Sequence, residues 1–140
     1  MTHRSLLDTD ILSEVLKGVN ANILKLAEAY RKEYGVFTTS VITVLEIVKG
    51  FQKAAREEKI SEFLNGITSE NVLSIRQKEA ELAGRIYGEL ERRGVTIGRA
   101  DPMVASVALQ HDLVLVTGNI RHFERIRSLG YPLRMSNWRE

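Results

Sequence analysis

Apolar and polar residues follow two periods along the chain, one typical of strands and one typical of helices. Short apolar runs predict five strands, at residues 5–8, 36–38, 71–74, 113–116 and 133–135. The run at 113–116 is apolar at every position, which is typical of a strand buried on both faces of a parallel sheet. The last run is expected to form an edge strand.

Between these runs, apolar residues recur at helical spacing. The pattern predicts helices at residues 11–17, 20–34, 41–56, 59–65, 76–93, 101–111 and 119–127. Gly18, Gly35 and Gly94 follow three of these segments and suit helix ends. Ser40 is expected to cap the helix that follows it, and Pro102 suits a first helical position.

The alternation of strands and helices decides the expected fold class. No Asn-Gly type turn joins two strands, so hairpins are not expected. The alternation instead predicts a parallel sheet with helices on both faces. The sequence therefore predicts an α/β fold, a three-layer α/β/α sandwich around a mostly parallel central sheet. The chain has 140 residues without a repeat or linker, which predicts a single domain over 1–140.

Composition narrows the classes of protein. Hydrophobic residues make up 44% and charged residues 27%, as in folded globular proteins. The absence of cysteine excludes a disulfide scaffold, a thiolate zinc site and a cysteine nucleophile. Residues 1–7 hold no signal-peptide run, and no stretch approaches the roughly 20 apolar residues of a membrane span, so we expect a cytoplasmic protein. The net charge of +2 permits an anionic partner without requiring one.

Polar residues at strand ends are the first candidates for chemistry, because ligands of open α/β sheets bind at the carboxyl ends of the strands. Asp8 ends the first predicted strand, and Thr117 and Asn119 follow the fully apolar one. Asp101 opens a predicted helix. Asp112 instead precedes its strand and is expected at the opposite edge of the sheet.

Glu46 lies within the predicted helix 41–56, on the side opposite its apolar stripe. The residues expected to face the core are Val41, Val44, Leu45, Val48 and Phe51. Thr43 and Gly50 are small residues on the side of Glu46, which leaves room for a cleft. The alternative is a solvated ion pair between Glu46 and Lys49.

These spacings resemble the PIN-domain family over nearly the whole chain. The matching segments are 6–13, 40–50, 99–109 and 116–123. PIN domains are small nucleases whose acidic residues hold Mg²⁺ or Mn²⁺ and which cut single-stranded RNA, and many are the toxins of VapBC toxin–antitoxin pairs. The resemblance therefore implies a metal-dependent endoribonuclease, most like such a toxin, with a VapB-like antitoxin as partner. It also implies a homodimer.

The same resemblance assigns the site residues. It places catalytic acids at Asp8, Glu46 and Asp101, with Asp8 and Asp101 as metal ligands. Asn119 stands where many members carry a fourth acid, and it offers a carbonyl oxygen without a charge. Mg²⁺ prefers oxygen ligands and lowers the pKa of an attacking water. Supporting roles fall to Thr9, Ser40 and Thr117, and RNA-binding roles to Lys49, Arg99 and Arg121.

Each assignment has an alternative. Asp8, Asp101 and Asn119 are also good helix caps. The run Asp8-Thr9-Asp10 also resembles the first motif of haloacid-dehalogenase-type phosphatases, but the later segment around Asp101 lacks their second acid. A receiver domain is disfavoured because the strand 71–74 does not end in Asp. An inactive PIN module that binds RNA or protein without cutting is the main alternative.

Overall fold

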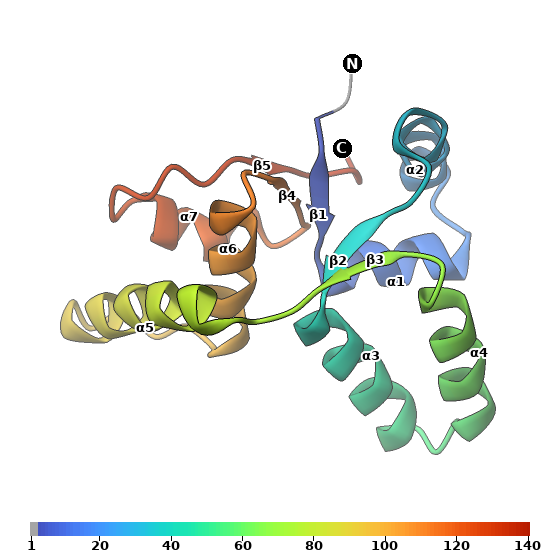
Figure 1. Cartoon of the computed structure of the whole chain (residues 1–140), viewed down its shortest axis with the longest axis horizontal. Coiled ribbons are helices and arrows are strands. Elements are labelled where there is room, and N and C mark those ends of the chain that lie inside the picture. The colour runs from blue at the N-terminus through green and yellow to red at the C-terminus, as the bar shows by residue number, and fades with distance from the viewer. Residues whose placement is uncertain (1–2) are drawn as a thin grey trace.

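A computed structural model describes residues 3–140 of the chain (Figure 1). Its strands are β1 (Ser5–Leu7), β2 (Thr38–Ser40), β3 (Asn71–Leu73), β4 (Val114–Val116) and β5 (Met135–Ser136). Its helices are α1 (Thr9–Lys17), α2 (Ala21–Tyr34), α3 (Val41–Lys53), α4 (Glu57–Ile67), α5 (Gln77–Arg92), α6 (Ala100–Gln110) and α7 (Ile120–Arg127). No helix within residues 3–140 is both long and apolar enough to cross a membrane.

The predicted elements are present, with ends that differ by a few residues. The second strand begins at Thr38 instead of residue 36. Helix α3 ends at Lys53 instead of residue 56, because Ala55 adopts a left-handed φ of 55° that an α-helix cannot continue. Helix α6 begins at Ala100, so the expected first position of Pro102 is wrong by two residues, although the whole first turn tolerates proline.

Every strand pairing is parallel, as predicted. Strands β1, β4 and β5 form one sheet in that order, with β5 at an edge, and β2 pairs with β3 in a second. The Thr39 hydroxyl donates a hydrogen bond of 2.8 Å to the Leu7 carbonyl, which joins the second sheet to β1. Strands β1 and β4 pair in register, with Leu7 opposite Val116, so both strands end at the same level.

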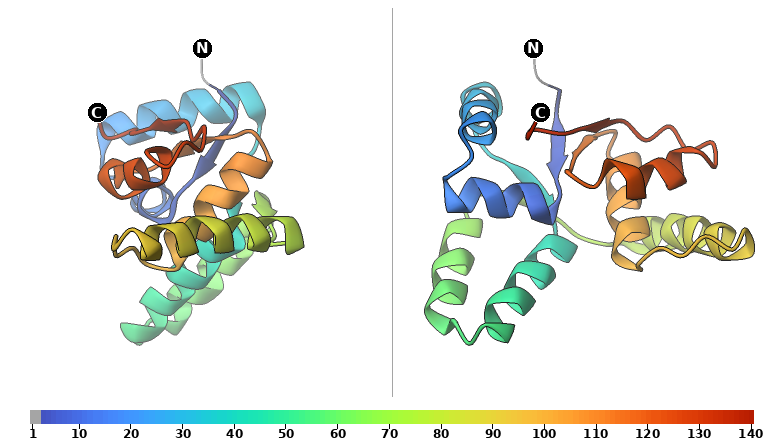
Figure 2. Two further views of the ribbon diagram at one scale, coloured as in Figure 1. Left: turned by 90° about the vertical axis from the view of Figure 1, so that its left-hand side faces the viewer. Right: turned by 180° about the vertical axis from the view of Figure 1, so that it is seen from behind.

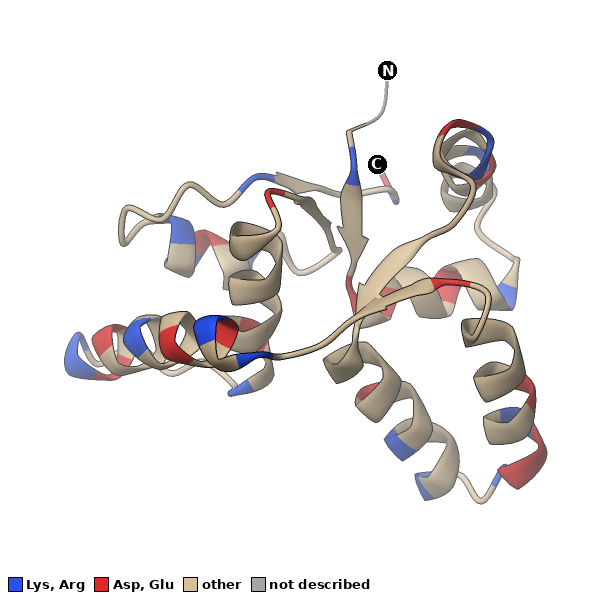
Figure 3. Ribbon diagram, in the orientation of Figure 1, with Lys and Arg blue, Asp and Glu red and all other residues tan. Residues whose placement is uncertain are grey.

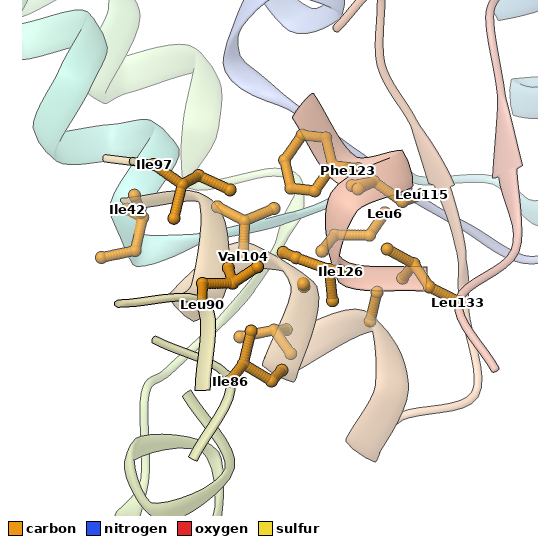
Figure 4. Packing of buried hydrophobic residues seen from close by; sticks show 13 residues of the cluster. Leu6, Ile42, Ile86, Leu90, Ile97, Val104, Leu115, Phe123, Ile126 and Leu133 are labelled. Atoms are coloured by element: carbon orange, nitrogen blue, oxygen red, sulfur yellow. The ribbon is translucent and has the colours of Figure 1, made fainter. Parts of the chain in front are cut away.

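Two apolar clusters lie on opposite faces of β1 and β4, which makes the sandwich three-layered. Successive residues of a strand point to opposite faces. Leu6 and Leu115 contact the cluster beneath α5, α6 and α7 (Figure 4). Leu7 and Val116 contact the cluster beneath α1, α2 and α4. Figures 1 and 2 show these two groups of helices on either side of the sheet.

The predicted core-facing stripe of α3 is wrong at two positions. Val41 and Leu45 are 37% and 59% exposed, whereas Ile42, Thr43 and Ile47 are buried. The other three residues of the stripe are only partly buried against the second cluster. The reason is the position of α3, which leaves the sheet at β2 and pairs with α4 as a projecting arm (Figure 1). Ile42 reaches one cluster and Ile47 the other, so no single stripe faces a single core.

One fully buried carboxylate, Glu79, has a structural role. It accepts hydrogen bonds from the backbone N–H of Arg76 at 2.9 Å and from the Arg76 guanidinium at 3.0 Å. These contacts lower the pKa of Glu79 to about 2. The pair caps the first turn of α5, so Glu79 serves the helix and not the candidate site.

Candidate active site

Asp8 and Thr117 lie side by side because β1 and β4 end at the same level. The Asp8 backbone N–H donates to the Val116 carbonyl at 2.9 Å. Asp8 Oδ1 accepts from the Thr9 N–H at 2.9 Å, and Oδ2 accepts from the Thr117 hydroxyl at 2.9 Å. Asp8 therefore caps α1, as the alternative required, and is also fixed toward β4.

Asp8 is buried, and its burial is the main reason why its pKa is higher than that of an ordinary aspartate. Desolvation raises the pKa of Asp8 to about 6, although its hydrogen bonds from Thr9 and Thr117 act in the opposite direction. The negative charges of Asp10 and Asp101 raise the pKa of Asp8 further. Burial and the neighbouring charges therefore disfavour the ionised form of Asp8 relative to a carboxyl group in water, and a nearby cation would favour it.

Glu46 is half-buried, and its carboxylate bonds to Thr9, the residue that follows Asp8. The Thr9 hydroxyl donates to Glu46 Oε1 at 2.5 Å and lies 3.1 Å from the Thr43 hydroxyl. No ion pair joins Glu46 to Lys49 in the part of the chain that the structure describes, so the solvated pair is not formed. The first residue of α1 thus connects α3 to the end of β1, and Figure 3 shows acidic residues at both places.

Asp101 contacts a residue of α7, His122. It is the second residue of α6, whose N-cap is Arg99, so the expectation that Asp101 caps this helix is wrong. Its Oδ2 lies 3.3 Å from Nδ1 of His122. Burial raises the pKa of Asp101 and the contact with His122 lowers it, while the charges of Glu46 and Asp10 raise it. Acids from three separate segments of sequence therefore share one electrostatic environment.

Two expected caps are not formed. Asn119 occupies the N-cap position of α7, but its side chain is exposed and makes no capping bond; its backbone N–H donates to the Thr117 hydroxyl at 3.0 Å. Ser40 occupies the N-cap position of α3 without capping it. Its hydroxyl is buried and, within residues 3–140, has no hydrogen-bond partner. Neither side chain is thus committed to holding a helix end.

Asp10 belongs to the same acidic group, although its sequence context indicates only a phosphatase-like motif. Its Oδ1 accepts from the Ile11 N–H at 2.9 Å and its Oδ2 from the Gly118 N–H at 2.8 Å. Arg139 lies 3.5 Å from the same Oδ2. The position of Asp10 in the first turn after Asp8 was the available signal. Nothing in the sequence indicated Arg139.

A groove of about 690 Å³ leads away from the acids between α1, α3 and α4. Thr9 and Glu46 line one part of it. Phe51 and Phe63 give it an apolar wall, and Lys59 lines it from α4. The cleft predicted beside Glu46 is therefore present.

The three predicted RNA-binding residues, Lys49, Arg99 and Arg121, are all exposed. Among residues 3–140 no ion pair involves any of the three. Their charges are therefore available to an anionic ligand. Asp112 is exposed and pairs with Arg134 at 2.8 Å where β4 begins, which is the opposite edge from Asp8.

The donor atoms at the site suit a hard divalent cation. They are carboxylate oxygens and hydroxyls, with the unpartnered Ser40 hydroxyl in addition, and no thiol. Among residues 3–140, however, no three His, Asp or Glu side chains are already gathered to hold a metal. The carboxylates instead bond to neighbouring groups, such as Thr117 with Asp8 and His122 with Asp101. The donor atoms are therefore of the kind that a divalent metal prefers, and coordination requires these side chains to change rotamer.

Comparison with known proteins identifies the fold. The PIN domain family model matches residues 5–129. This chain belongs to the PIN domain family. It is 33% identical over 137 residues to ribonuclease VapC2 of Haemophilus influenzae, covering 95% of this chain and 96% of the relative. It is 31% identical over 134 residues to the tRNA(fMet)-specific endonuclease VapC of Shigella flexneri, with the same coverage.

Solved structures of VapBC proteins agree with this assignment. The chain is similar to VapBC2 from Rickettsia felis bound to a promoter DNA fragment, with a TM-score of 0.79 and 26% identity over 96% of this chain and 98% of that one. DNA-bound VapBC from Salmonella typhimurium gives a TM-score of 0.79 and 29% identity over 98% and 99%. The family resemblance and the α/β fold class expected from sequence are confirmed, and the phosphatase and receiver alternatives are excluded.

Proposed function

We propose that this PIN-domain protein is a metal-dependent endoribonuclease that cuts single-stranded RNA and acts as the toxin of a VapBC pair. The observation that carries the proposal is the shared environment of Asp8, Glu46 and Asp101, three acids from distant segments, in a fold whose relatives are named ribonucleases. The charge that these acids build up needs a cation, and a cation at carboxylates is what phosphodiester hydrolysis uses.

We assign Asp8 and Asp101 as the ligands of Mg²⁺ or Mn²⁺, with Glu46 completing the acidic pocket and Asn119 supplying a neutral oxygen. A metal held by these residues would supply Lewis-acid chemistry, which would polarise the scissile phosphate and lower the pKa of an attacking water. The protein contributes orientation. Thr117 fixes Asp8 by a hydrogen bond. Burial keeps bulk water from this carboxylate and strengthens its attraction to a cation.

Two further groups of residues support the acids, by positioning them or by binding the RNA. Thr9 links α1 to Glu46, and the Ser40 hydroxyl is a free buried oxygen at the end of β2. Lys49, Arg99 and Arg121 contact the RNA backbone, whose affinity for proteins is largely electrostatic.

The partner that we propose is a VapB-like antitoxin. The similar structures are of VapBC assemblies, which supports such a partner for this chain. An antitoxin Arg or Lys at the acids would form charge-assisted hydrogen bonds in the place of the metal. We further propose that the protein is a cytoplasmic homodimer, as its resemblance to VapC toxins implies.

Cleavage of labelled RNA tests the function. The purified chain should cut a single-stranded RNA or a tRNA with Mg²⁺ or Mn²⁺, and EDTA should stop the reaction. Metal added back in excess of EDTA should restore it. Gel analysis of the products distinguishes internal cuts from end trimming. Folded protein that binds these RNAs but leaves them whole with either metal would support the inactive-module alternative instead.

Asn119 provides a separate prediction on metal affinity. Asn119→Asp should tighten Mg²⁺ binding on the order of tenfold, because another nearby negative charge attracts a divalent cation by more than about 1.4 kcal/mol. Isothermal titration measures the affinity. Asn65→Asp, on an exposed turn of α4, adds the same charge away from the site and should leave it unchanged. Equal affinities for both variants would place Asn119 outside the metal's reach.

A further inference from the structure

The last residues of the chain return from β5 to the sheet beside β1 (Figures 1 and 2). Trp138 is 4% exposed and belongs to the second apolar cluster, with its ring 5.9 Å from that of Tyr30. Its carbonyl accepts from the Asn22 side chain at 3.0 Å, and the Arg139 N–H donates to Asn137 Oδ1 at 3.0 Å. This anchored segment has a fixed path, so the place of Arg139 is set by the fold.

The Arg139 guanidinium lies at the acidic group. Its Nη1 is 3.5 Å from Asp10 Oδ2, and its side chain remains 40% exposed. Among the lysines and arginines of residues 3–140, Arg139 is the one ion-paired with Asp8, Asp10, Glu46 or Asp101. A partly exposed ion pair of this length contributes little to stability. The guanidinium can therefore exchange Asp10 for another anion at little cost in free energy.

Gly118 makes room for this contact. A Cβ at residue 118 would overlap Arg139 Nη1 and would lie 2.6 Å from Asp10 Oδ2. Gly118 does not have the left-handed φ of Gly18, Gly35, Gly94 and Gly130, so its backbone alone does not require glycine. A side chain at residue 118 would therefore have to displace the end of the Arg139 or the Asp10 side chain.

We propose that Arg139 is an RNA-binding residue of this site, whose guanidinium contacts a phosphate of the bound strand beside the one that is cut. The proposal rests on the proposed nuclease function. RNA phosphates that approach clustered carboxylates are repelled, and a fixed cation at that position offsets the repulsion. Arg presents a planar fork of donors that matches phosphate, and the Arg139 side chain is 40% exposed.

RNA binding in EDTA, where the strand is not cut, tests the proposal. Fluorescence anisotropy of a labelled single strand should show about tenfold weaker binding for Arg139→Gln, a common magnitude for a charge-assisted contact. The slope of log affinity against log salt should fall by about 0.7, the loss of one phosphate contact. The matched control is Arg134→Gln, which removes another half-exposed, ion-paired arginine at the other end of β4 and should match the parent.

Gly118→Ala provides a second variant that keeps the positive charge of Arg139, because the added Cβ would meet both the Arg139 guanidinium and the Asp10 carboxylate and would disturb their contact. It should weaken binding as Arg139→Gln does, whereas Gly88→Ala, where a Cβ meets nothing within 4 Å, should not. With Mg²⁺, both site variants should raise KM more than they lower kcat. If the contact of Arg139 were purely structural, these variants would lower the melting temperature without changing KM more than kcat.

The outcomes separate the two proposals. If Arg139→Gln binds and cuts like the parent and Arg134→Gln, the role of Arg139 is wrong and the nuclease function stands. Faster cutting by Arg139→Gln would also overturn the role, since Arg139 would then block the site. A parent that neither binds nor cuts RNA would overturn both.

Discussion

Replacing Asp101 by Asn should lower the rate of RNA cleavage by about a hundredfold or more, because Asn is a neutral and weaker ligand and the charge stabilisation that a bound metal would supply is on the order of several kcal/mol. Asn has the size of Asp and can still bond to His122, which lies 3.3 Å away. The change therefore removes the negative charge and little else. Single-turnover cleavage with excess enzyme measures the chemical step, and circular dichroism verifies the fold.

Asp112→Asn is the matched control for this change. Asp112 is an exposed acid at the opposite end of β4, with a left-handed φ of 53° that Asn adopts readily. This variant should cut RNA at the parental rate. Parental cleavage by Asp101→Asn as well would show that the charge of Asp101 is not used, and the proposed ligand set would be wrong.

The sequence predicts the part of the site that depends on local patterns. Asp8 and Thr117 follow apolar runs, and parallel strands in register bring such positions together without further information. Helical spacing relates Thr43, Glu46 and Gly50 whatever the helix packs against, and Glu46 and Gly50 both line the groove beside α3. The family resemblance then joined these local predictions into one site.

What the sequence does not predict depends on how distant segments fold back. The contact of Arg139 with Asp10 needs the path of the chain after β5, which Trp138 fixes by packing on Tyr30. The exposure of Leu45 follows from α3 projecting away from the sheet, and an apolar stripe carries no information on that direction. The free hydroxyl of Ser40 is likewise a tertiary property, since its sequence position suits an ordinary cap.

Asp8→Asn should stabilise the metal-free protein at pH 8 and have no such effect at pH 3. Burial raises the folded-state pKa of Asp8 to about 6 from its ordinary value of 3.8, so the folded protein binds this proton more tightly than the unfolded chain does. The contribution of neutral Asp8 to the folding stability of the protein is fully present below pH 3.8 and is lost as the pH rises through about 6. Asn stays neutral, so the gain at pH 8 should approach about 2–3 kcal/mol.

Urea denaturation in EDTA between pH 3 and 8 measures this difference, with Asp112→Asn as the control for an exposed acid outside the site. Asn can still accept from the Thr9 N–H and can donate to the Thr117 hydroxyl, which conserves the cap. Added Mg²⁺ should stabilise the parent and stabilise Asp8→Asn much less, because a ligand stabilises only through its affinity for the folded state. A variant that is less stable than the parent at pH 8, yet gains equally from Mg²⁺, would mean that Asp8 serves α1 as a cap and holds no metal.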